Sequence, residues 1–462
     1  MTRVLAVFPL LCLTTAEALA HASERGHVLL LPTHLYLWGG ALTVAASFLM
    51  LLALPPQVLV RAFGHRMHIS DISIAPLWVI GIFSSLLVLV GLLAGWLGSR
   101  DPLSNPLPLL IWTLLWLSLP LLHALVGDMW RWLNPWTALW RAIGKPGLNL
   151  RLPRRVGYWP ATLLLFCFAW LELVYPAPDD PRQLAMFTAA YFLLTMAGIL
   201  AFGHRRWMAR GEFLGIFFRT AARLSPLASS GIGRRRKLSL TIPGGRLSRV
   251  HPLPLSGIAF VLLLIAYISF DGLMKTFTWL HMIGTNPLLY PGRTALLLPN
   301  SLGLSGAWAG FSLCFFAAVL AGDRMAGGRA PMRAAGLLIW SLIPIALAYH
   351  FSHYLVVMLV NLQYAFVAAS DPFATGLNLF GTADYHVRAG VVLGAHAAQL
   401  IWNAQAIAIV GGHVLAVALA HGLALRHYGT ADRAFRSQVP MAMLMIFYTL
   451  LGLWLLSSPT AG

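Results

Sequence analysis

The stretch LPLSGIAFVLLLIAYISF, residues 253–270, decides the fold class of this chain. It carries no charged side chain, and at about 1.5 Å per residue a helix of its length covers most of the ~30 Å hydrocarbon core of a bilayer. Nine further stretches have similar length and apolar character, near residues 35–54, 75–97, 107–126, 158–175, 184–202, 304–321, 337–360, 400–420 and 441–456. We therefore predict an all-α polytopic integral membrane protein with about ten transmembrane helices.

The composition of the 462-residue chain excludes a soluble enzyme. Charged residues make up 10% of it, against roughly 25% in a typical globular protein, and apolar residues make up 59%. The formal net charge is +18, from 32 Lys and Arg against 14 Asp and Glu. In a soluble protein this charge would indicate a nucleic-acid partner. In a membrane protein it is typical of basic cytoplasmic loops, so we expect no nucleic acid to bind.

The N-terminus has the pattern of a signal peptide. Arg3 precedes an apolar run from Val4 to Leu13, and Ala18-Leu19-Ala20 is a small-residue pattern that a signal peptidase cleaves, here before His21. We predict a cleaved signal peptide over residues 1–20. The alternative is an uncleaved first helix, for which the apolar run is short.

A basic linker separates two predicted halves of five spans each. The linker, residues 204–252, holds eleven Lys and Arg, and we expect a cytoplasmic, partly disordered segment that lies against anionic lipid. The flanking halves are residues 21–203 and 253–462. With a periplasmic mature N-terminus, the inner loops hold 25 Lys and Arg and the outer segments hold six, as retention of cations on the cytoplasmic side requires. We predict a bacterial inner-membrane location, periplasmic mature termini, and halves of opposite orientation, as in inverted-repeat transporters.

Two stretches near the predicted inner surface have the composition of membrane-surface anchors. Residues 127–136, GDMWRWLNPW, combine tryptophans with arginine and an Asn-Pro turn, and residues 212–223 form an amphipathic stretch. Tryptophan rings favour the headgroup region while cations stay in water. We expect both stretches to lie on the membrane surface.

Ionisable side chains inside the spans are candidates for a functional site, because they are costly in hydrocarbon. His350 and His353 stand three residues apart in the eighth span and therefore share one helix face. Pro344 cannot donate a backbone hydrogen bond, so we expect a kink just below the pair. His396 opens the ninth span, and His413 lies deeper in it.

Several interpretations of the two histidines stay open. One is hydrogen bonding to neighbouring helices, and another is a divalent metal, zinc or similar, bound with His396 and with Asp371 or Asp384 of the outer connection. Haem ligation by His353 and His396 is a third, and a proton or ion pathway is a fourth. The residues alone do not choose among them.

Further polar residues predict an outward-facing cleft. Glu172 in the fourth span and Asp271 after the sixth reach a depth similar to that of the histidines. We expect a cleft lined by the first, fourth, sixth, eighth and ninth spans. After signal cleavage, His21 would offer an amine and an imidazole together, with His27 nearby, a combination that binds copper. His413 is a weaker candidate metal ligand.

Motifs spread over nearly the whole chain carry a family resemblance. They are GDMWRWLNPW at 127–136, SFDGL at 269–273, His353-Tyr354, SDPF at 370–373, NLFGTADY at 378–385, Gly412-His413 and Ala420-His421. In these motifs the chain resembles the bacterial integral-membrane family named fenitrothion hydrolase. The resemblance implies cleavage of an organophosphorus triester, such as fenitrothion to 3-methyl-4-nitrophenol and dimethyl thiophosphate, by a membrane-bound hydrolase that works with a second subunit.

The resemblance supplies no catalytic residues, so they are argued from the residues themselves. Hydrolysis of a triester needs an activated water and charge stabilisation at phosphorus, and a divalent metal provides both. We expect His350, His353 and His396 to hold the metal, with Asp371 or Asp384 as a further ligand or as the base that orients the water. An apolar triester would reach such a site through the lipid bilayer.

Two other classes of protein compete with this hydrolase. The five-plus-five topology, the intramembrane histidines and the predicted copper-binding N-terminus also fit a transporter or a metal-handling membrane protein. A haem-bearing membrane redox subunit is the third class.

Overall fold

The computed structural model describes residues 32–461 except residues 54, 74–77, 231–234, 287, 289–291, 383 and 393. The predicted signal peptide, residues 1–20, lies outside the described residues, as do His21 and His27.

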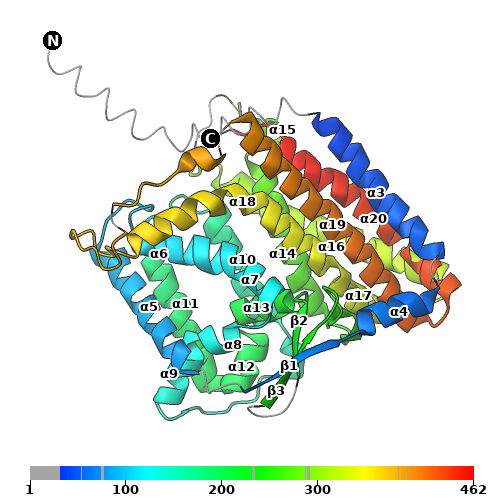
Figure 1. The fold of residues 1–462 in the computed structure, drawn as a ribbon, viewed down its shortest axis with the longest axis horizontal. Coiled ribbons are helices and arrows are strands. Elements are labelled where there is room, and N and C mark those ends of the chain that lie inside the picture. Colours follow the sequence, from blue (N-terminus) through cyan, green and yellow to red (C-terminus); the bar gives the residue numbers. More distant parts are fainter. Residues whose placement is uncertain are drawn as a thin grey trace.

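Ten helices among the described residues are long and apolar enough to cross a membrane (Figure 1). Eight of these spans contain one long helix each: α3 (Thr33–Ala53), α5 (Trp78–Leu97), α10 (Trp159–Leu173), α11 (Pro181–Phe202), α14 (Leu255–Met274), α16 (Leu297–Met325), α19 (Ala395–Tyr428) and α20 (Ala431–Ser457). The third span consists of three consecutive segments, α6 (Pro106–Pro108), η1 (Leu109–Ser118) and α7 (Leu119–Val126). The eighth span also consists of three, α17 (Pro331–Leu338), η5 (Ile339–Leu342) and α18 (Ile343–Ala368). The predicted all-α fold with ten spans is confirmed.

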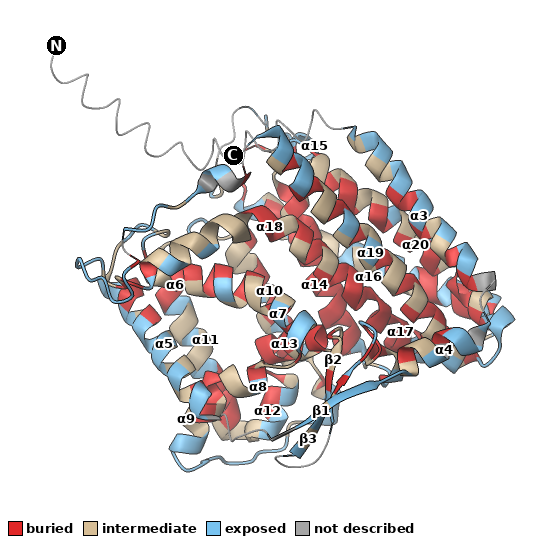
Figure 2. Cartoon of the chain, viewed as in Figure 1, coloured by how far each residue is buried: buried red, intermediate tan, exposed pale blue. Residues whose placement is uncertain are grey.

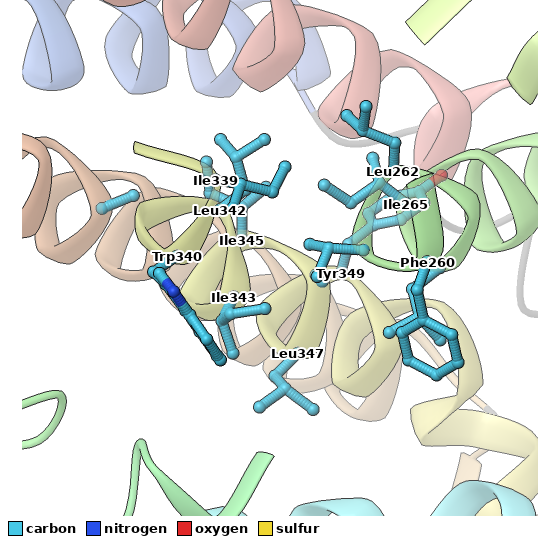
Figure 3. Packing of buried hydrophobic residues seen from close by; sticks show 14 of the residues in the cluster. Phe260, Leu262, Ile265, Ile339, Trp340, Leu342, Ile343, Ile345, Leu347 and Tyr349 are labelled. Atoms are coloured by element: carbon cyan, nitrogen blue, oxygen red, sulfur yellow. The ribbon is translucent and has the colours of Figure 1, made fainter. Parts of the chain in front are cut away.

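The helix α14 forms the centre of the bundle. Its side chains are almost all buried, Tyr267 completely, because it packs against α10, α16 and α18 (Figure 2). Phe260, Leu262 and Ile265 of α14 belong to the same apolar core as Tyr349 of α18 (Figure 3). The two predicted halves share this core, since α3 of the first half packs against α19 and α20 of the second.

The outermost helices turn apolar side chains away from the protein. Phe83 on α5 is 68% exposed and Leu313 on α16 is 72% exposed. Large apolar side chains exposed in this number are stable only in an apolar surrounding. The outer surface of the bundle therefore fits a lipid bilayer, which agrees with the predicted spans.

Two spans depart from regular α-helix. In the eighth span the 3₁₀ segment η5 interrupts the helix just before Pro344, so the predicted break below the histidines is confirmed. In the third span η1 is a π-helix of ten residues, a rare form that the sequence analysis did not predict. Pro120 follows it and has no N–H to offer to the carbonyl of Trp116, which gives a physical reason for the wider winding.

One end of the bundle carries a small antiparallel sheet, and we call it the sheet end. Strand β3 (Arg235–Leu240) lies between β1 (Met67–Ser73) and β2 (Leu227–Ser230). The predicted inner loops meet here, since β1 from the first connection pairs with β3 from the basic linker. Short elements complete this end: α4 (Pro56–Gly64), α8 (Trp130–Leu133), α9 (Pro135–Ala142), η2 (Arg154–Val156), α12 (His204–Arg210), α13 (Phe213–Ala222) and η3 (Leu247–Arg249).

The described part of the basic linker forms helices and strands, among them α12, α13, β2 and β3. The structure corrects the expectation for α13, which was predicted to lie on the membrane surface. Phe213 is 2% exposed and Phe218 is fully buried, because α13 packs against α7 and α10 inside the protein. Nine of its ten residues are buried, all except Arg219, so α13 is part of the protein interior rather than a membrane-surface helix.

The opposite end, which we call the far end, gathers the predicted outer connections. It includes α15 (Phe277–Met282) and η6 (Ala389–Val392). Arg100 and Asp180 form an ion pair there between two connections, and Lys275 accepts a backbone hydrogen bond from Ala461 near the C-terminus. The far end also holds the polar cluster described next.

Candidate functional site

A carboxylate at the far end of α14 holds two side chains of α18. Nε2 of His353 lies 2.9 Å from Oδ2 of Asp271, and the hydroxyl of Tyr354 donates to the same oxygen at 2.6 Å. His353 and Tyr354 are adjacent in the chain, so a single carboxylate fixes both rings. We call Asp271, His353 and Tyr354 the Asp271 cluster.

The pair is partly open to its surroundings. The His353 side chain is 15% exposed and the Asp271 side chain is 16% exposed. When the imidazole is neutral and Nε2 donates to Asp271, Nδ1 of His353 is left as a basic nitrogen. The arrangement can therefore accept a proton at Nδ1 and stabilise the resulting imidazolium with the carboxylate.

A second carboxylate, Glu172 of α10, lies close enough to Asp271 to interact with it electrostatically. Its Oε2 atom is buried with no hydrogen-bond partner. Arg293 does not neutralise it by contact, since Nη1 of Arg293 donates to the backbone oxygens of Glu172 and Tyr175 at 2.6 and 3.4 Å. A buried acceptor without a donor is costly and calls for a water, a proton or a ligand.

Gly272 makes room for a third polar group beside the cluster. A Cβ at this position would lie 2.7 Å from the hydroxyl oxygen of Tyr349 and 3.7 Å from Cε1 of His353. The Tyr349 hydroxyl is buried and has no hydrogen-bond partner. A side chain larger than hydrogen at position 272 would therefore displace the tyrosine that lies next to His353.

Charged groups of the far-end loops interact electrostatically with the carboxylates of this region. Burial raises the pKa of the Asp179 carboxyl, while Arg293 and Lys275 act in the opposite direction. The far-end loops therefore carry both signs of charge.

The structure separates the two histidines that the sequence placed on one face. Nε2 of His350 lies 3.3 Å from the carbonyl oxygen of Leu117 in η1, and its Nδ1 has no partner. The His350 ring also meets Trp116 edge-on at 5.5 Å between centroids. His353 turns instead to Asp271, because α18 packs between η1 on one side and α14 on the other.

The remaining predicted ligands lie apart from the Asp271 cluster. His396 is exposed on the first turn of α19, and Asp384 is exposed in the loop before it. Asp371 accepts hydrogen bonds from the backbone N–H groups of Thr375 and Gly376, which lower the pKa of its carboxyl. Asp371 thus closes a turn.

The predicted metal ligands lie in different surroundings in the described part of the chain. His350, His353 and His396 have different neighbours, and within the described parts of the chain no three His, Cys, Asp or Glu side chains are grouped as metal ligands. His413 bonds the carbonyl oxygen of Ile409 on its own helix, and its Nε2 has no partner. A divalent ion shared by the predicted histidines therefore stays a prediction.

The sequence analysis missed the role of Tyr354 and the direct partner of His353. The signal for the second was present, since Asp271 is the one carboxylate next to the apolar stretch 253–270. A lone carboxylate at a span end needs a donor from another helix, and a histidine at similar depth is the natural one.

In comparisons with known proteins, no family model, no curated protein and no solved structure matches the chain. A function can therefore be argued only from the residues and their geometry.

Proposed function

We propose that the protein is a membrane-bound hydrolase of organophosphorus triesters, with fenitrothion as the reference substrate and His353 as the general base. The observation that carries the proposal is the Asp271–His353 pair, partly exposed in an otherwise apolar bundle. A carboxylate that fixes a histidine in one orientation is the arrangement by which many hydrolases draw a proton from a nucleophile. The resemblance to fenitrothion hydrolases supplies the substrate class.

The reaction needs only a water and the histidine as reactants besides the triester. Nδ1 of His353 takes a proton from the water while its oxygen forms a bond to phosphorus. The bond from phosphorus to the aryl oxygen breaks, and nitrophenolate leaves with the electron pair. Asp271 stabilises the imidazolium, which then releases its proton to solvent or to the phenolate. Tyr354 holds Asp271 in place through its 2.6 Å hydrogen bond.

The location in a membrane suits this substrate. An apolar triester concentrates in the bilayer, so a site between spans receives it from lipid rather than from water. The leaving nitrophenolate is charged and departs to the aqueous side, where the far-end loops carry Arg293 and Lys275.

The test is nitrophenol release from fenitrothion by membranes that contain this chain alone, beside membranes from an empty-vector host. The variant His353→Gln keeps the size and polarity of the side chain but cannot serve as the base. The matched control is His396→Ala, an exposed histidine of the adjacent span. Release by the wild type and the control, with loss in His353→Gln, supports the proposal.

Other outcomes separate the alternatives. Loss of activity in both histidine variants, with restoration by added zinc after chelator treatment, would favour a shared metal. If only co-expression with a second polypeptide gives release, the resemblance is right and the chain needs a partner. The absence of release in every arrangement, from protein shown to be inserted and folded, would reject the hydrolase.

A proton-coupled transporter is the second candidate, and a series of buried polar groups favours it. Inward from Asp271 lie the unpartnered Tyr349 hydroxyl, then Tyr448, which is hydrogen-bonded to Ser269. The ring of His413 is 6.0 Å from the Tyr448 ring, and its Nε2 is unpartnered. Buried groups of this kind form proton relays in membrane proteins.

The two candidates respond differently to the loss of His413. Purified protein in vesicles with an entrapped pH dye would show proton movement if the relay works, and His413→Ala would stop it. The same substitution lies far along the relay from Asp271, so nitrophenol release would be unchanged under the hydrolase.

A further inference from the structure

The sheet end contains a cavity with two arginines in its wall. Its volume is about 220 Å³. Arg219 of α13, and Arg223 just after it, supply the charge, while Tyr158 and Thr220 supply hydroxyl groups. The rest of the lining is mostly apolar and includes Phe260 and Val261 of α14 together with Trp340, Ile216 and Leu253. No Asp or Glu is among the described residues that line this cavity.

The arginines are fixed rather than free to swing into water. The guanidinium carbon of Arg223 lies 4.8 Å from the centroid of the Trp340 ring, and Trp340 is anchored by its own hydrogen bond to the carbonyl of His251. Nη2 of Arg219 donates to the carbonyl of Met208 at 2.8 Å. Stacked, hydrogen-bonded guanidinium groups keep their remaining N–H donors directed at one place.

Positive charge in this region exceeds what its neighbours neutralise. Burial lowers the pKa of the Arg223 guanidinium, and the nearby Arg246 and Arg219 lower it further. Glu212 interacts with Arg219 electrostatically, but its oxygens accept hydrogen bonds from Tyr191 and from the backbone N–H of Gly215, both at 2.7 Å, and no carboxylate is among the described groups that act on Arg223. A bound anion would relieve this excess.

We propose that this cavity binds the phosphate of an anionic ligand, with Arg219 and Arg223 as the phosphate-binding residues and Tyr158 as a further donor. Paired guanidinium groups match the geometry of phosphate oxygens. The apolar wall, which includes Phe260, Val261 and Leu253, favours a phospholipid whose headgroup would occupy the cavity. Basic pockets between spans at the cytoplasmic side are typical lipid headgroup sites.

The experiment measures binding of dioleoyl phosphatidylglycerol to the full-length protein in nanodiscs of phosphatidylcholine, by native mass spectrometry of the released complex. The variant Arg219→Gln/Arg223→Gln is compared with Arg205→Gln, an exposed arginine of the same linker that lies outside the cavity. Since each arginine near a lipid surface contributes about five-fold to binding, we expect roughly 25-fold weaker binding in the double variant and near wild-type binding in Arg205→Gln.

Two further arms identify the source of the phosphate and guard against misfolding. In one arm, inorganic phosphate is titrated in place of the lipid. Tight binding of phosphate without binding of phosphatidylglycerol would support the phosphate site and show that its ligand is a soluble anion rather than a lipid. Arg223→Lys keeps the positive charge but loses the planar guanidinium group that stacks on Trp340. Its affinity for phosphatidylglycerol should therefore lie between that of the wild type and that of the double variant. Equal loss in Arg205→Gln and in the cavity variant would overturn the proposal, since the charge alone would then explain binding.

Discussion

The far end and the sheet end of the bundle carry buried charge of opposite sign. At the far end, Asp271 and Glu172 lie within electrostatic reach of each other, and His353 is the hydrogen-bonded partner of Asp271. At the sheet end, Arg219, Arg223 and their arginine neighbours outnumber the acidic groups. Net positive charge at one end suits an anionic membrane surface. Partly exposed carboxylate and imidazole at the other end suit proton transfer.

The largest effect should follow from removing the negative charge of the far-end pair. In Asp271→Asn, the partner of His353 is neutral and its amide N–H₂ can donate to Nε2, which would place the imidazole proton on Nδ1, the nitrogen that has to act as the base. We therefore expect kcat/KM for nitrophenol release to fall by about 10²–10⁴. The matched control is Asp179→Asn, a carboxylate of the same end outside the Asp271 cluster. A fall of equal size in both would show that the general charge of the far end matters rather than the pair.

A buried carboxylate at the sheet end should matter for stability instead. Glu212 is fully buried and accepts hydrogen bonds from Tyr191, from the backbone of Gly215 and from the Trp130 ring nitrogen. The variant Glu212→Ala leaves these donors unpaired, and we expect it to lower the free energy of unfolding by roughly 2–4 kcal/mol. Thermal unfolding of the purified protein in detergent measures this. Unchanged stability would contradict the structural role.

Glu212 also predicts a pH dependence of stability. Burial raises the pKa of its carboxyl, although hydrogen bonds from Tyr191 and Gly215 oppose the rise. Because the folded state then holds the proton more tightly than the unfolded chain, this group's stability contribution is present at low pH and is lost as pH rises from the ordinary carboxyl pKa through the folded pKa. As the pH rises above the ordinary carboxyl pKa, the wild-type melting temperature should therefore fall relative to that of Glu212→Gln. Parallel curves would contradict this.

Substitution of Gly272 should have a smaller effect, on both the stability of the protein and the activity of the far-end site. The variant Gly272→Ala places a methyl group against the Tyr349 hydroxyl, so we expect a loss of about 1–3 kcal/mol in unfolding free energy together with reduced activity. Gly306 of α16 is the matched control, since nothing lies within 4 Å of a Cβ built there. Gly306→Ala should be neutral or slightly stabilising because alanine is the better helix former. Equal behaviour of the two variants would remove the steric argument.

The smallest expected effect concerns Asp371, which the sequence analysis named as a catalytic candidate. In the structure it closes a turn through Thr375 and Gly376. Nitrophenol release by Asp371→Asn should therefore remain within about two-fold of the wild type, as expected for a loop substitution outside the site. A loss comparable to that of Asp271→Asn would return Asp371 to the reaction.

The spans were predictable because hydrophobic length is a local property of the sequence. The same holds for the break at Pro344, which follows from one missing N–H. The partner of His353 was not predictable in this way, because it depends on which helices pack on either side of α18. The burial of α13 was harder to predict, because Arg219 interrupts its mostly apolar sequence and further charged residues surround it.

The π-helix in the third span marks the limit of sequence reasoning most clearly. Pro120 predicts an irregularity in the third span, but a proline in a helix more often produces a kink than a π-helix. Only the packing of η1 against α18 brings the Leu117 carbonyl to His350. The different partners of His350 and His353 follow from that packing.

The most direct test of the central claim is a double-mutant cycle between Asp271 and His353, with nitrophenol release as the readout. If the two side chains act as one unit, Asp271→Asn combined with His353→Gln should be no slower than His353→Gln alone, because the base has already been removed. If the two losses multiply, Asp271 and His353 act independently, and the account of a carboxylate-oriented base is contradicted.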